Sequence, residues 1–494
     1  MAVDPRTPVI IGVGQFLNRV DQGADPLEPT TLMVQAIRAA ETDAGASGAT
    51  AAADVIGVVG VVSWRYRDPG RLVAAGLGAE DAATWYPSMG GNSPQMLVNR
   101  MAADIAAGRM DLGVVVGGEA YRSRVAAKKA DRTLDWTRQA DDVEADWHEG
   151  ESFVLGHAAE MARGLFLPTQ SYPLFENALR HAAGRTLDEH LAVVGEMWAG
   201  FSRVARDNPY AWRREAYTAA EITTPTEDNR MVGFPYTKRM VSNPDVDMAA
   251  GCIICSVERA QALGVPEDRW VFPLSGTDGK DRVMSERLDF TSSAAIGVAG
   301  NRALALAGAD IDDVAHLDVY SCFPSAVQLA LGELGIGMDR QLTVYGGLCF
   351  AGGPWNNPVS HAIASMVGVL REDPGSVGLV TANGGNVEKH AFGVYSTVPP
   401  TGGFRHERPQ DEIDAVGSRE VSEAFAGPVA IEAWTVMHER DGSMSRGHAA
   451  CLTADGVRVW GVTTDGDTMK RFETDDLVGV AATVDADGEL RLVG

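Results

Sequence analysis

One order of polar and apolar positions occurs twice along the chain. Each copy has a glycine pair, a proline near a helix start, an amphipathic helical run, an apolar strand and a second glycine pair. The first copy spans residues 90–118, with its helix at 95–107 and its strand at 112–116. The second spans residues 352–385, with its helix at 359–370 and its strand at 377–381. Two matching units of about thirty residues predict a duplicated α/β fold with a site between its halves.

The segments around these repeats predict two halves and an insertion. Apolar runs at 9–13 and 55–62, separated by an amphipathic run at 30–44, give the βαβ order typical of a largely parallel sheet. A helix-rich stretch, residues 121–243, interrupts this rhythm, which resumes with the apolar run at 249–257. We therefore assign residues 1–120 and 244–267 to the N-terminal half and residues 268–400 to the C-terminal half.

The pattern changes again after residue 400. We interpret residues 401–425 as a linker and residues 426–494 as a separate domain, in which Asp-Gly turns separate short strand-like runs. This pattern predicts a small antiparallel β-barrel of the oligonucleotide/oligosaccharide-binding (OB) type. The domain lacks a basic stripe, so we expect it to contact a protein partner or to act as a lid, and not to bind nucleic acid.

Composition narrows the functional classes. The chain has 494 residues with 42 Lys and Arg against 67 Asp and Glu, a formal net charge of −25. This balance argues against nucleic acid or an anionic membrane as a partner. No apolar run is long enough for a membrane span, and the first residues show no signal-peptide pattern. The five scattered cysteines fit a reducing compartment, so we predict a cytoplasmic protein, and we predict no metal site.

Several motifs, taken in order, resemble the thiolase superfamily. They are Thr7–Gly14, the turn Gly117-Gly118-Glu119, the segment Asp247–Ala250 after the insertion, and Ser321-Cys322-Phe323. The last motif is closest to that of sterol-carrier-type thiolases. The resemblance covers residues 5–398, and the added C-terminal domain resembles that of thiolase-like proteins. It implies a coenzyme A (CoA) or acyl-CoA ligand, a role in lipid metabolism and an acyltransferase-type ancestry, with no permanently bound cofactor.

The resemblance also places four catalytic positions of thiolases on residues that cannot do the same chemistry. The nucleophilic cysteine falls on Gly91, and the oxyanion-hole position falls on Tyr320. The activating histidine falls on Gly353, and the second cysteine on Thr381 or Ala382. Loss of a nucleophile that works with its base costs on the order of a millionfold in rate. We therefore expect neither ordinary thiolysis nor Claisen condensation.

Four other residues are considered as replacements in a reorganised acyltransferase site: Ser93, Cys322, Cys349 and His361. A serine needs a base, and a cysteine reacts as its thiolate. No pair among the four is an obvious nucleophile and base in the sequence. A capping or core role is favoured for each, so two hypotheses stay open: a non-thiolytic CoA thioester binder, and an acyltransferase.

The CoA phosphates are assigned to basic residues of the insertion. Residues 121–240 hold 16 Lys and Arg against 18 Asp and Glu, so this region is far less acidic than the rest of the chain. The resemblance implies that basic side chains here bind the phosphates. We rank Lys238 and Arg239 first and add Arg213 and Arg214.

Overall fold

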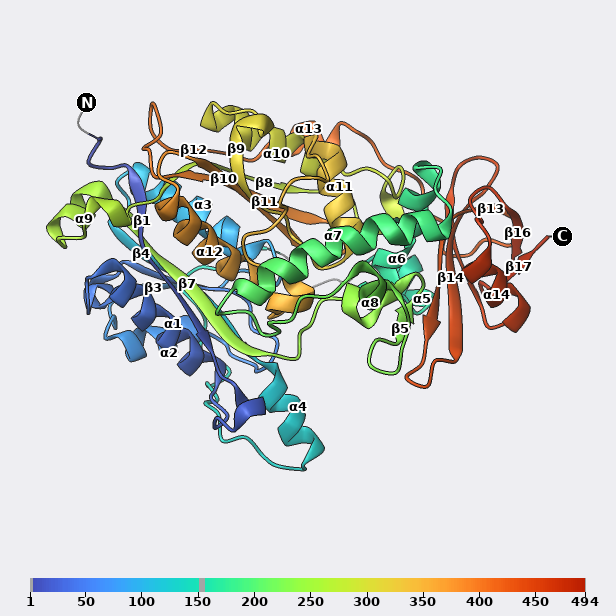
Figure 1. Ribbon diagram of the computed structural model, residues 1–494, viewed down its shortest axis with the longest axis horizontal. Helices are drawn as coiled ribbons and strands as arrows, with labels where there is room; N and C mark the ends of the chain where they lie inside the picture. Colours follow the sequence, from blue (N-terminus) through green and yellow to red (C-terminus); the bar gives the residue numbers. More distant parts are fainter. Residues whose placement is uncertain (1–2, 151–155, 494) are drawn as a thin grey trace.

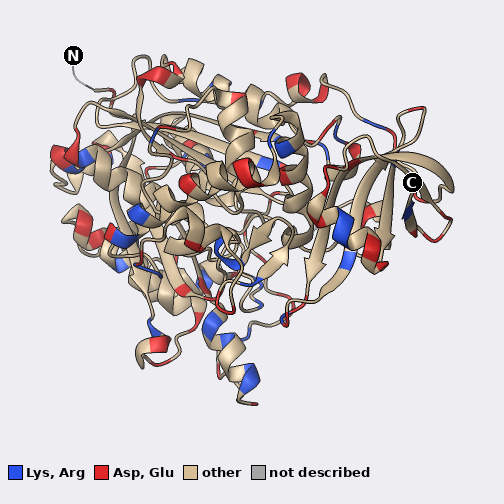
Figure 2. Ribbon diagram, turned by 45° about the vertical axis from the view of Figure 1, so that its right-hand side comes forward, with Lys and Arg blue, Asp and Glu red and all other residues tan. Residues whose placement is uncertain are grey.

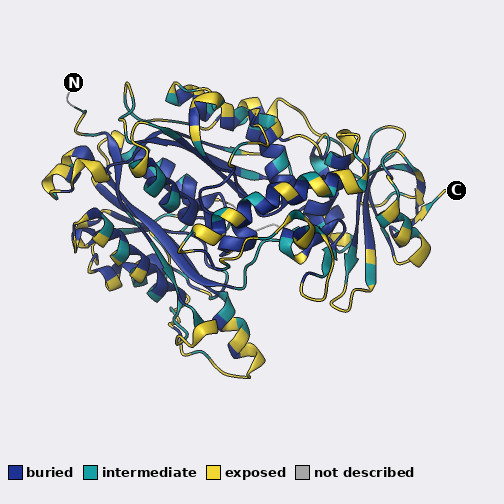
Figure 3. Ribbon diagram, in the orientation of Figure 1, coloured by how far each residue is buried: buried dark blue, intermediate teal, exposed yellow. Residues whose placement is uncertain are grey.

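The computed structural model describes residues 3–150 and 156–493. Two five-stranded sheets form its centre, with helices between them and on their outer faces, and a third sheet lies at the C-terminal end (Figure 1). Figure 3 shows that both central sheets and the helices between them are buried, whereas the outer helices expose one side.

The N-terminal sheet has the strand order β1-β7-β4-β2-β3. Its strands are β1 (Pro8–Leu17), β2 (Val55–Val58), β3 (Ala83–Trp85), β4 (Leu112–Ala120) and β7 (Asp247–Ser256), and its helices are α1 (Pro29–Ala44), α2 (Pro69–Leu77) and α3 (Ser93–Ala106). The prediction of a largely parallel sheet is wrong, because β7 pairs antiparallel with both β1 and β4. Ala120 at the end of β4 pairs with Asp247 at the start of β7, so the chain re-enters the sheet at the end where it left and must run backwards.

The C-terminal sheet has the order β12-β8-β11-β10-β9. Its strands are β8 (Phe272–Lys280), β9 (Val314–Asp318), β10 (Val377–Gly384), β11 (Lys389–Ser396) and β12 (Arg405–Glu407), and its helices are α10 (Ala294–Ala307), α11 (Pro324–Leu334) and α12 (Pro358–Glu372). Helices α3 and α12 contact both sheets and form the middle layer. The helix and the strand predicted in each repeat are confirmed as α3 with β4 and α12 with β10.

The insertion is helical and leads back to the core through a short hairpin. It contains α4 (Tyr121–Lys129), α5 (Ala158–Ala162), α6 (Pro168–Ala182), α7 (Leu187–Asp207), α8 (Ala219–Thr223), β5 (Met231–Gly233) and β6 (Tyr236–Thr237). Helix α7 begins at a capping box, in which Thr186 Oγ1 accepts from the Glu189 N–H and the Glu189 carboxylate accepts from the Thr186 N–H. A 3-10 turn, Lys238–Met240, follows the hairpin, and α9 (Val257–Ala262) follows β7.

The C-terminal domain contains β13 (Gly427–His438), β14 (Met444–Leu452), β15 (Arg458–Thr463), α14 (Gly466–Thr474), β16 (Ala481–Val484) and β17 (Leu490–Leu492). The predicted antiparallel pairing is confirmed, but the closed barrel is not, because the strands follow the open path β15-β14-β13-β16-β17. An isolated bridge between Val462 and Glu489 joins the region of β15 to that of β17. Helix α14 was not expected; Asp465 caps it by accepting from the Thr468 N–H.

The segment predicted as a linker, residues 401–425, contributes to the core sheet. Within it, β12 pairs in parallel with β8, and α13 (Gln410–Asp414) follows. Across residues 3–150 and 156–493, no helix is both long and apolar enough to cross a membrane.

Candidate functional site

The two repeats meet at their glycine pairs. A Cβ added to Gly384 would lie 3.0 Å from Gly90 Cα and 3.1 Å from Gly91 N. Such distances leave no space for a side chain, so glycine at position 384 allows the end of β10 to touch the turn before α3. The structure thus joins the two halves at the place where the repeat pattern predicts a site.

Gly91 faces the side chain of Tyr320. A Cβ added at Gly91 would overlap Tyr320 Oη and the Asn383 carbonyl oxygen, and it would lie 2.9 Å from Tyr320 Cζ. The space that a side chain at position 91 would need is therefore occupied by an aromatic residue from the other half. Tyr320 is 9% exposed, and burial raises the pKa of its phenol well above the ordinary value.

The position assigned to the second cysteine adjoins Tyr320. The Tyr320 N–H donates to Thr381 Oγ1 at 2.9 Å, and Ala382 is buried beside it. Tyr320, Thr381 and Ala382 line a small cavity of about 10 Å³, together with Asn383 and His390. This volume is at the lower limit for one water molecule.

Cys322 lies two residues after Tyr320 among buried polar side chains. Asn383 Nδ2 donates to Tyr172 Oη at 3.0 Å, and it lies 4.0 Å from Cys322 Sγ. Tyr172 Oη donates to the Gly385 carbonyl at 3.1 Å, and its ring stacks on Phe323 with a centroid distance of 4.4 Å. Burial raises the pKa of the Cys322 thiol to about 12.

Cys349 lies in a π-helical turn, Gly347–Ala351, that contacts α7. The Trp198 Nε1–H donates to Cys349 Sγ at 3.3 Å. Burial raises the pKa of the Cys349 thiol to about 12, with smaller opposing effects from Trp198 and Arg213. Both cysteines are therefore thiols at neutral pH.

Gly353 contacts the segment that follows the insertion. A Cβ added at Gly353 would overlap Ser242 Oγ. The Gly353 N–H donates to the Asn243 carbonyl at 2.9 Å, and the Ser242 N–H donates to the Cys322 carbonyl at 3.1 Å. The end of the insertion thus occupies the place assigned to the activating histidine.

The two remaining replacement candidates have other contacts. Ser93 is the first residue of α3, and its hydroxyl donates to the Ser88 carbonyl at 3.2 Å. His361 is fully buried in α12, where its Nδ1 is 2.7 Å from Gln15 Oε1 and its ring stacks on Tyr345. Burial lowers the pKa of His361 to about 3, so its ring is neutral at physiological pH.

The predicted phosphate-binding residues include a group of neighbouring cations. We call Arg213, Arg230, Lys238 and Arg239 the cation cluster. Partial burial lowers the pKa of Lys238, and so do the nearby charges of Arg213, Arg230 and Arg239. None of these four side chains forms an ion pair with a carboxylate of the described residues. Asp228 offsets part of this charge, and the remaining excess of cations in so acidic a chain favours an anionic ligand at this place.

The cluster is connected to the glycine site by backbone contacts. The Arg213 N–H donates to the Phe350 carbonyl at 3.0 Å, in the turn that holds Cys349. Arg213 of the cluster also lines a polar cavity of about 510 Å³. Its lining includes the basic residues Arg19, Arg122, Arg213 and Arg214, the carboxylates Asp21, Glu215 and Asp245, and the rings of Trp212 and Tyr217.

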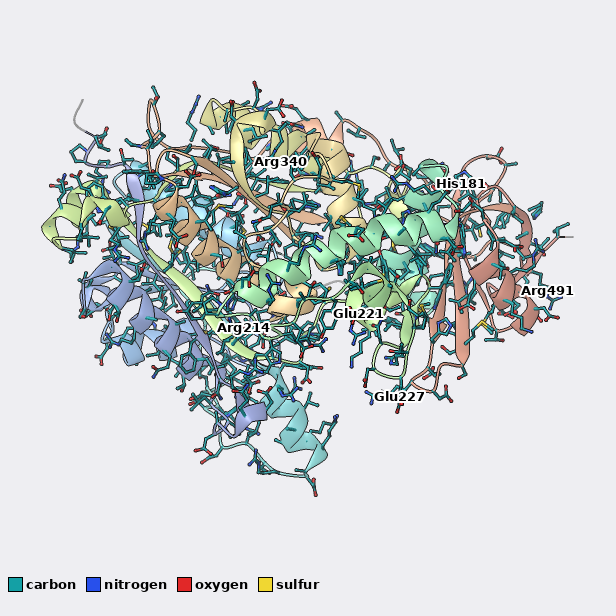
Figure 4. All side chains as sticks on the ribbon, viewed as in Figure 1. His181, Arg214, Glu221, Glu227, Arg340 and Arg491 are labelled. Carbon is teal, nitrogen blue, oxygen red and sulfur yellow. The ribbon has the colours of Figure 1, made fainter. Side chains whose placement is uncertain are left out.

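Arg214 and Arg239, two of the predicted phosphate-binding residues, make different contacts. Arg214 Nε donates to the Arg206 carbonyl at 3.2 Å, and in the view of Figure 4 Arg214 lies between α7 and α4. In Figure 2, further basic residues are coloured on α4, the helix that projects at the bottom of that view. The guanidinium of Arg239 lies over the ring of Tyr217 at 4.6 Å.

Four residues of this region escaped the sequence reasoning: Tyr172, Arg230, Ser242 and Asn383. Asn383 directly precedes the glycine pair at 384–385, a position that marks a strand end and offered a usable signal. Tyr172, Arg230 and Ser242 carry no motif, and only the return of the insertion to the core brings them here.

Comparison with known proteins agrees with this architecture. A family model described as "Thiolase-like protein type 1 additional C-terminal domain" matches residues 409–489. The fold is similar to the crystal structure of a monomeric SCP2-thiolase like protein type 1 from Mycobacterium smegmatis, with a TM-score of 0.84, 32% identity and full coverage of both chains.

Two more distant structures match the fold without the added domain. The Ltp2-ChsH2(DUF35) aldolase has a TM-score of 0.60 at 19% identity, covering 80% of this chain and 99% of that chain. The dimeric peroxisomal thiolase of Saccharomyces cerevisiae has a TM-score of 0.55 at 13% identity, covering 80% and 98%. No match was found among curated proteins by sequence.

Proposed function

The chain belongs to the thiolase-like proteins of type 1, and from this we propose that it binds CoA or an acyl-CoA without running the cysteine-dependent thiolase reaction. The phosphates would contact the cation cluster, and the thioester would point toward Gly91. The observation that carries the proposal is the cation cluster, whose four side chains form no ion pair with a carboxylate of the described residues and which lies next to the glycine site.

The chemistry around the cavity supports a nucleotide-containing thioester. CoA carries several phosphate groups and an adenine, and guanidinium groups bind phosphate through paired N–H donors. Trp212 and Tyr217 line the same cavity as Arg213, and the guanidinium groups of Arg19 and Arg239 lie over their rings at 4.3 and 4.6 Å. We extend the proposal to a lipid-related acyl group and to a role in lipid metabolism, because the family resemblance implies both.

The absence of a side chain at Gly91 supports the second half of the proposal. Thiolysis needs a thiolate at this place, and the space for one is taken by Tyr320. Acyl transfer through Cys322 or Cys349, the alternative, would need a thiolate from a thiol whose pKa is raised to about 12. His361 would be a poor base for either, because burial lowers its pKa to about 3.

We also propose that the protein is a monomer in the cytoplasm, because its M. smegmatis relative is described as monomeric and all five cysteines are free and buried. The free edge of the N-terminal sheet is covered from within the chain. The Trp147 N–H donates to the Thr84 carbonyl and the Tyr86 N–H donates to the Trp147 carbonyl, both at 3.0 Å. A protein partner of the C-terminal domain would use the part of its surface that does not contact the insertion.

Calorimetric titration with CoA tests the proposal. The double variant Arg213→Gln/Lys238→Gln should weaken CoA binding by at least about a hundredfold, since each of the two charged hydrogen bonds contributes about 1.5–3 kcal/mol. Arg491→Gln, which removes an exposed cation of the C-terminal domain (Figure 4), should leave the affinity unchanged. Acetoacetyl-CoA should be bound but not cleaved. No CoA binding by the wild type, or an acyl adduct on a cysteine, would refute the proposal.

A further inference from the structure

The hairpin β5–β6 belongs to the insertion by sequence but to the C-terminal domain by hydrogen bonding. Strand β5 pairs antiparallel with β13, with Gly233 opposite Met437. The Phe234 N–H donates to the Val436 carbonyl at 2.8 Å, and Thr435 Oγ1 donates to the Phe234 carbonyl at 2.9 Å. The sheet of the added domain therefore extends into the segment that carries the predicted phosphate site.

This hairpin leads directly into the cation cluster. Lys238 and Arg239 follow β6 without a linker. The Lys238 N–H donates to the Arg230 carbonyl, and the Arg239 N–H donates to Asn229 Oδ1, both at 2.9 Å. The position of β5 thus sets the positions of Arg230, Lys238 and Arg239. Three residues further on, Ser242 contacts Gly353.

The C-terminal domain is also fixed to the C-terminal half of the core. Arg458 is fully buried and donates to the Glu432 carboxylate and, at 2.9 Å, to the Ser285 carbonyl. The Trp460 Nε1–H donates to Ser285 Oγ at 2.8 Å. Strand pairing on one side and these contacts on the other make the domain a bridge between the core and the hairpin.

A third contact joins the same strand to the helices of the insertion. Asn177 Nδ2 on α6 donates to the Trp434 carbonyl at 2.8 Å, and it also lies 3.4 Å from the Phe234 carbonyl oxygen. Asn177 is fully buried, and the Arg180 guanidinium of the same helix lies over the Trp434 ring. Figure 4 shows His181 at this boundary, where its Nδ1 is 2.9 Å from Asp476 Oδ2.

We infer that the C-terminal domain is a positioning element for the ligand site: β13 holds the β5–β6 hairpin, and through it the cation cluster, in the geometry that binds CoA. The inference rests on the proposed function in that CoA is the ligand. Thr435 is its principal positioning residue. Because coupling of this kind is reciprocal, CoA binding should in turn stabilise the pairing of β13 with β5.

Two matched variants test the inference. Thr435→Val removes the hydroxyl that donates to Phe234 while keeping the side-chain volume, and Thr483→Val makes the same change on exposed β16, away from the hairpin. Thr435→Val should weaken CoA binding about three- to tenfold, the loss of one neutral hydrogen bond, and should speed amide hydrogen exchange across residues 234–242. Thr483→Val should change neither, and Thr435→Ser, which keeps the hydroxyl, should restore both.

The two readouts separate this inference from the proposed function. If the wild type does not bind CoA, the proposed function fails, and hydrogen exchange of Thr435→Val alone decides whether β13 holds the hairpin. If Thr435→Val does not fold, exchange of the wild-type amides of 434–437 with and without CoA decides, since slower exchange with CoA is expected. Unchanged affinity and unchanged exchange in folded Thr435→Val would overturn the inference.

Discussion

At the scale of single residues, glycines decide what the central site can hold. Gly91, Gly353 and Gly384 each lie where another side chain or backbone segment approaches too closely for a Cβ. Their neighbours come from distant parts of the chain: Tyr320, Ser242 and the turn at Gly90. A glycine at a predicted catalytic position is therefore a packing requirement in this structure as well as a missing functional group.

This packing makes a prediction for Gly91→Ala. The added Cβ would overlap Tyr320 Oη and the Asn383 carbonyl, so we expect a loss of roughly 1–3 kcal/mol in the free energy of unfolding. Gly368→Ala in α12 is the matched control, because no heavy atom lies within 4 Å of its added Cβ. The control should gain about 0.5–1 kcal/mol from helix propensity. Urea denaturation of both variants gives the comparison, and equal stabilities would contradict the packing argument.

At the scale of elements, strand β14 carries a buried histidine on the face that lies toward the insertion. His448 is buried and lies opposite Thr435 of β13, the residue that contacts Phe234. Among the residues that the structure describes, neither ring nitrogen of His448 has a hydrogen-bond partner. Burial lowers the pKa of His448 to about 3, and the charge of Arg446 adds to this effect.

The buried His448 should therefore make the folded protein less stable at acidic pH. The folded-state pKa of His448 is below its ordinary value of 6.5, so between those two values the unfolded chain binds more protons. Its contribution to stability is complete above pH 6.5 and falls as the pH approaches 3. From pH 7 to pH 5 we expect it to decrease by roughly 2 kcal/mol. His448→Val should lose less stability than the wild type over this range, and equal pH slopes in urea unfolding would disprove the assignment.

Elements were predictable where a local pattern is strong. Helices α3 and α12 have an amphipathic run after a proline, and both were predicted within two residues of their ends. Helix α14 was not predicted, because Asp465-Gly466 resembles a hairpin turn although the Asp465 side chain caps a helix. Strand β12 was missed because three residues with no apolar alternation become a strand only through β8.

At the scale of the whole molecule, the chain covers its own sheet edge. Unpaired edge strands invite pairing with a second copy, and residues 147–149 fill that role along β3. The Trp85 and Trp147 rings lie 5.2 Å apart, and Arg100 forms an ion pair with Glu149.

We therefore expect a monomer of 52.4 kDa in light scattering after size-exclusion chromatography. Trp147→Pro should expose the edge, since proline removes the N–H that donates to Thr84, and should produce concentration-dependent self-association. Trp64→Phe, which changes a tryptophan packed on Trp136, is the control for loss of a tryptophan, and it should remain monomeric. A wild-type dimer at micromolar concentration would contradict the expectation.

The sequence by itself determined the repeated unit, the insertion and the antiparallel character of the added domain, and it predicted which positions correspond to the catalytic residues of thiolases. These features depend on local periodicity, on turn residues and on the order of motifs. They needed no knowledge of which distant segments meet.

Only the tertiary structure decided what surrounds those positions. Tyr320 opposite Gly91, Ser242 against Gly353 and Arg230 beside Lys238 are contacts between segments that no periodicity relates. The direction of β7 and the sharing of β5 with the C-terminal sheet are likewise set by where the insertion returns to the core. Such contacts depend on chain connectivity and on packing in space. The pattern of residues along the sequence does not contain this information.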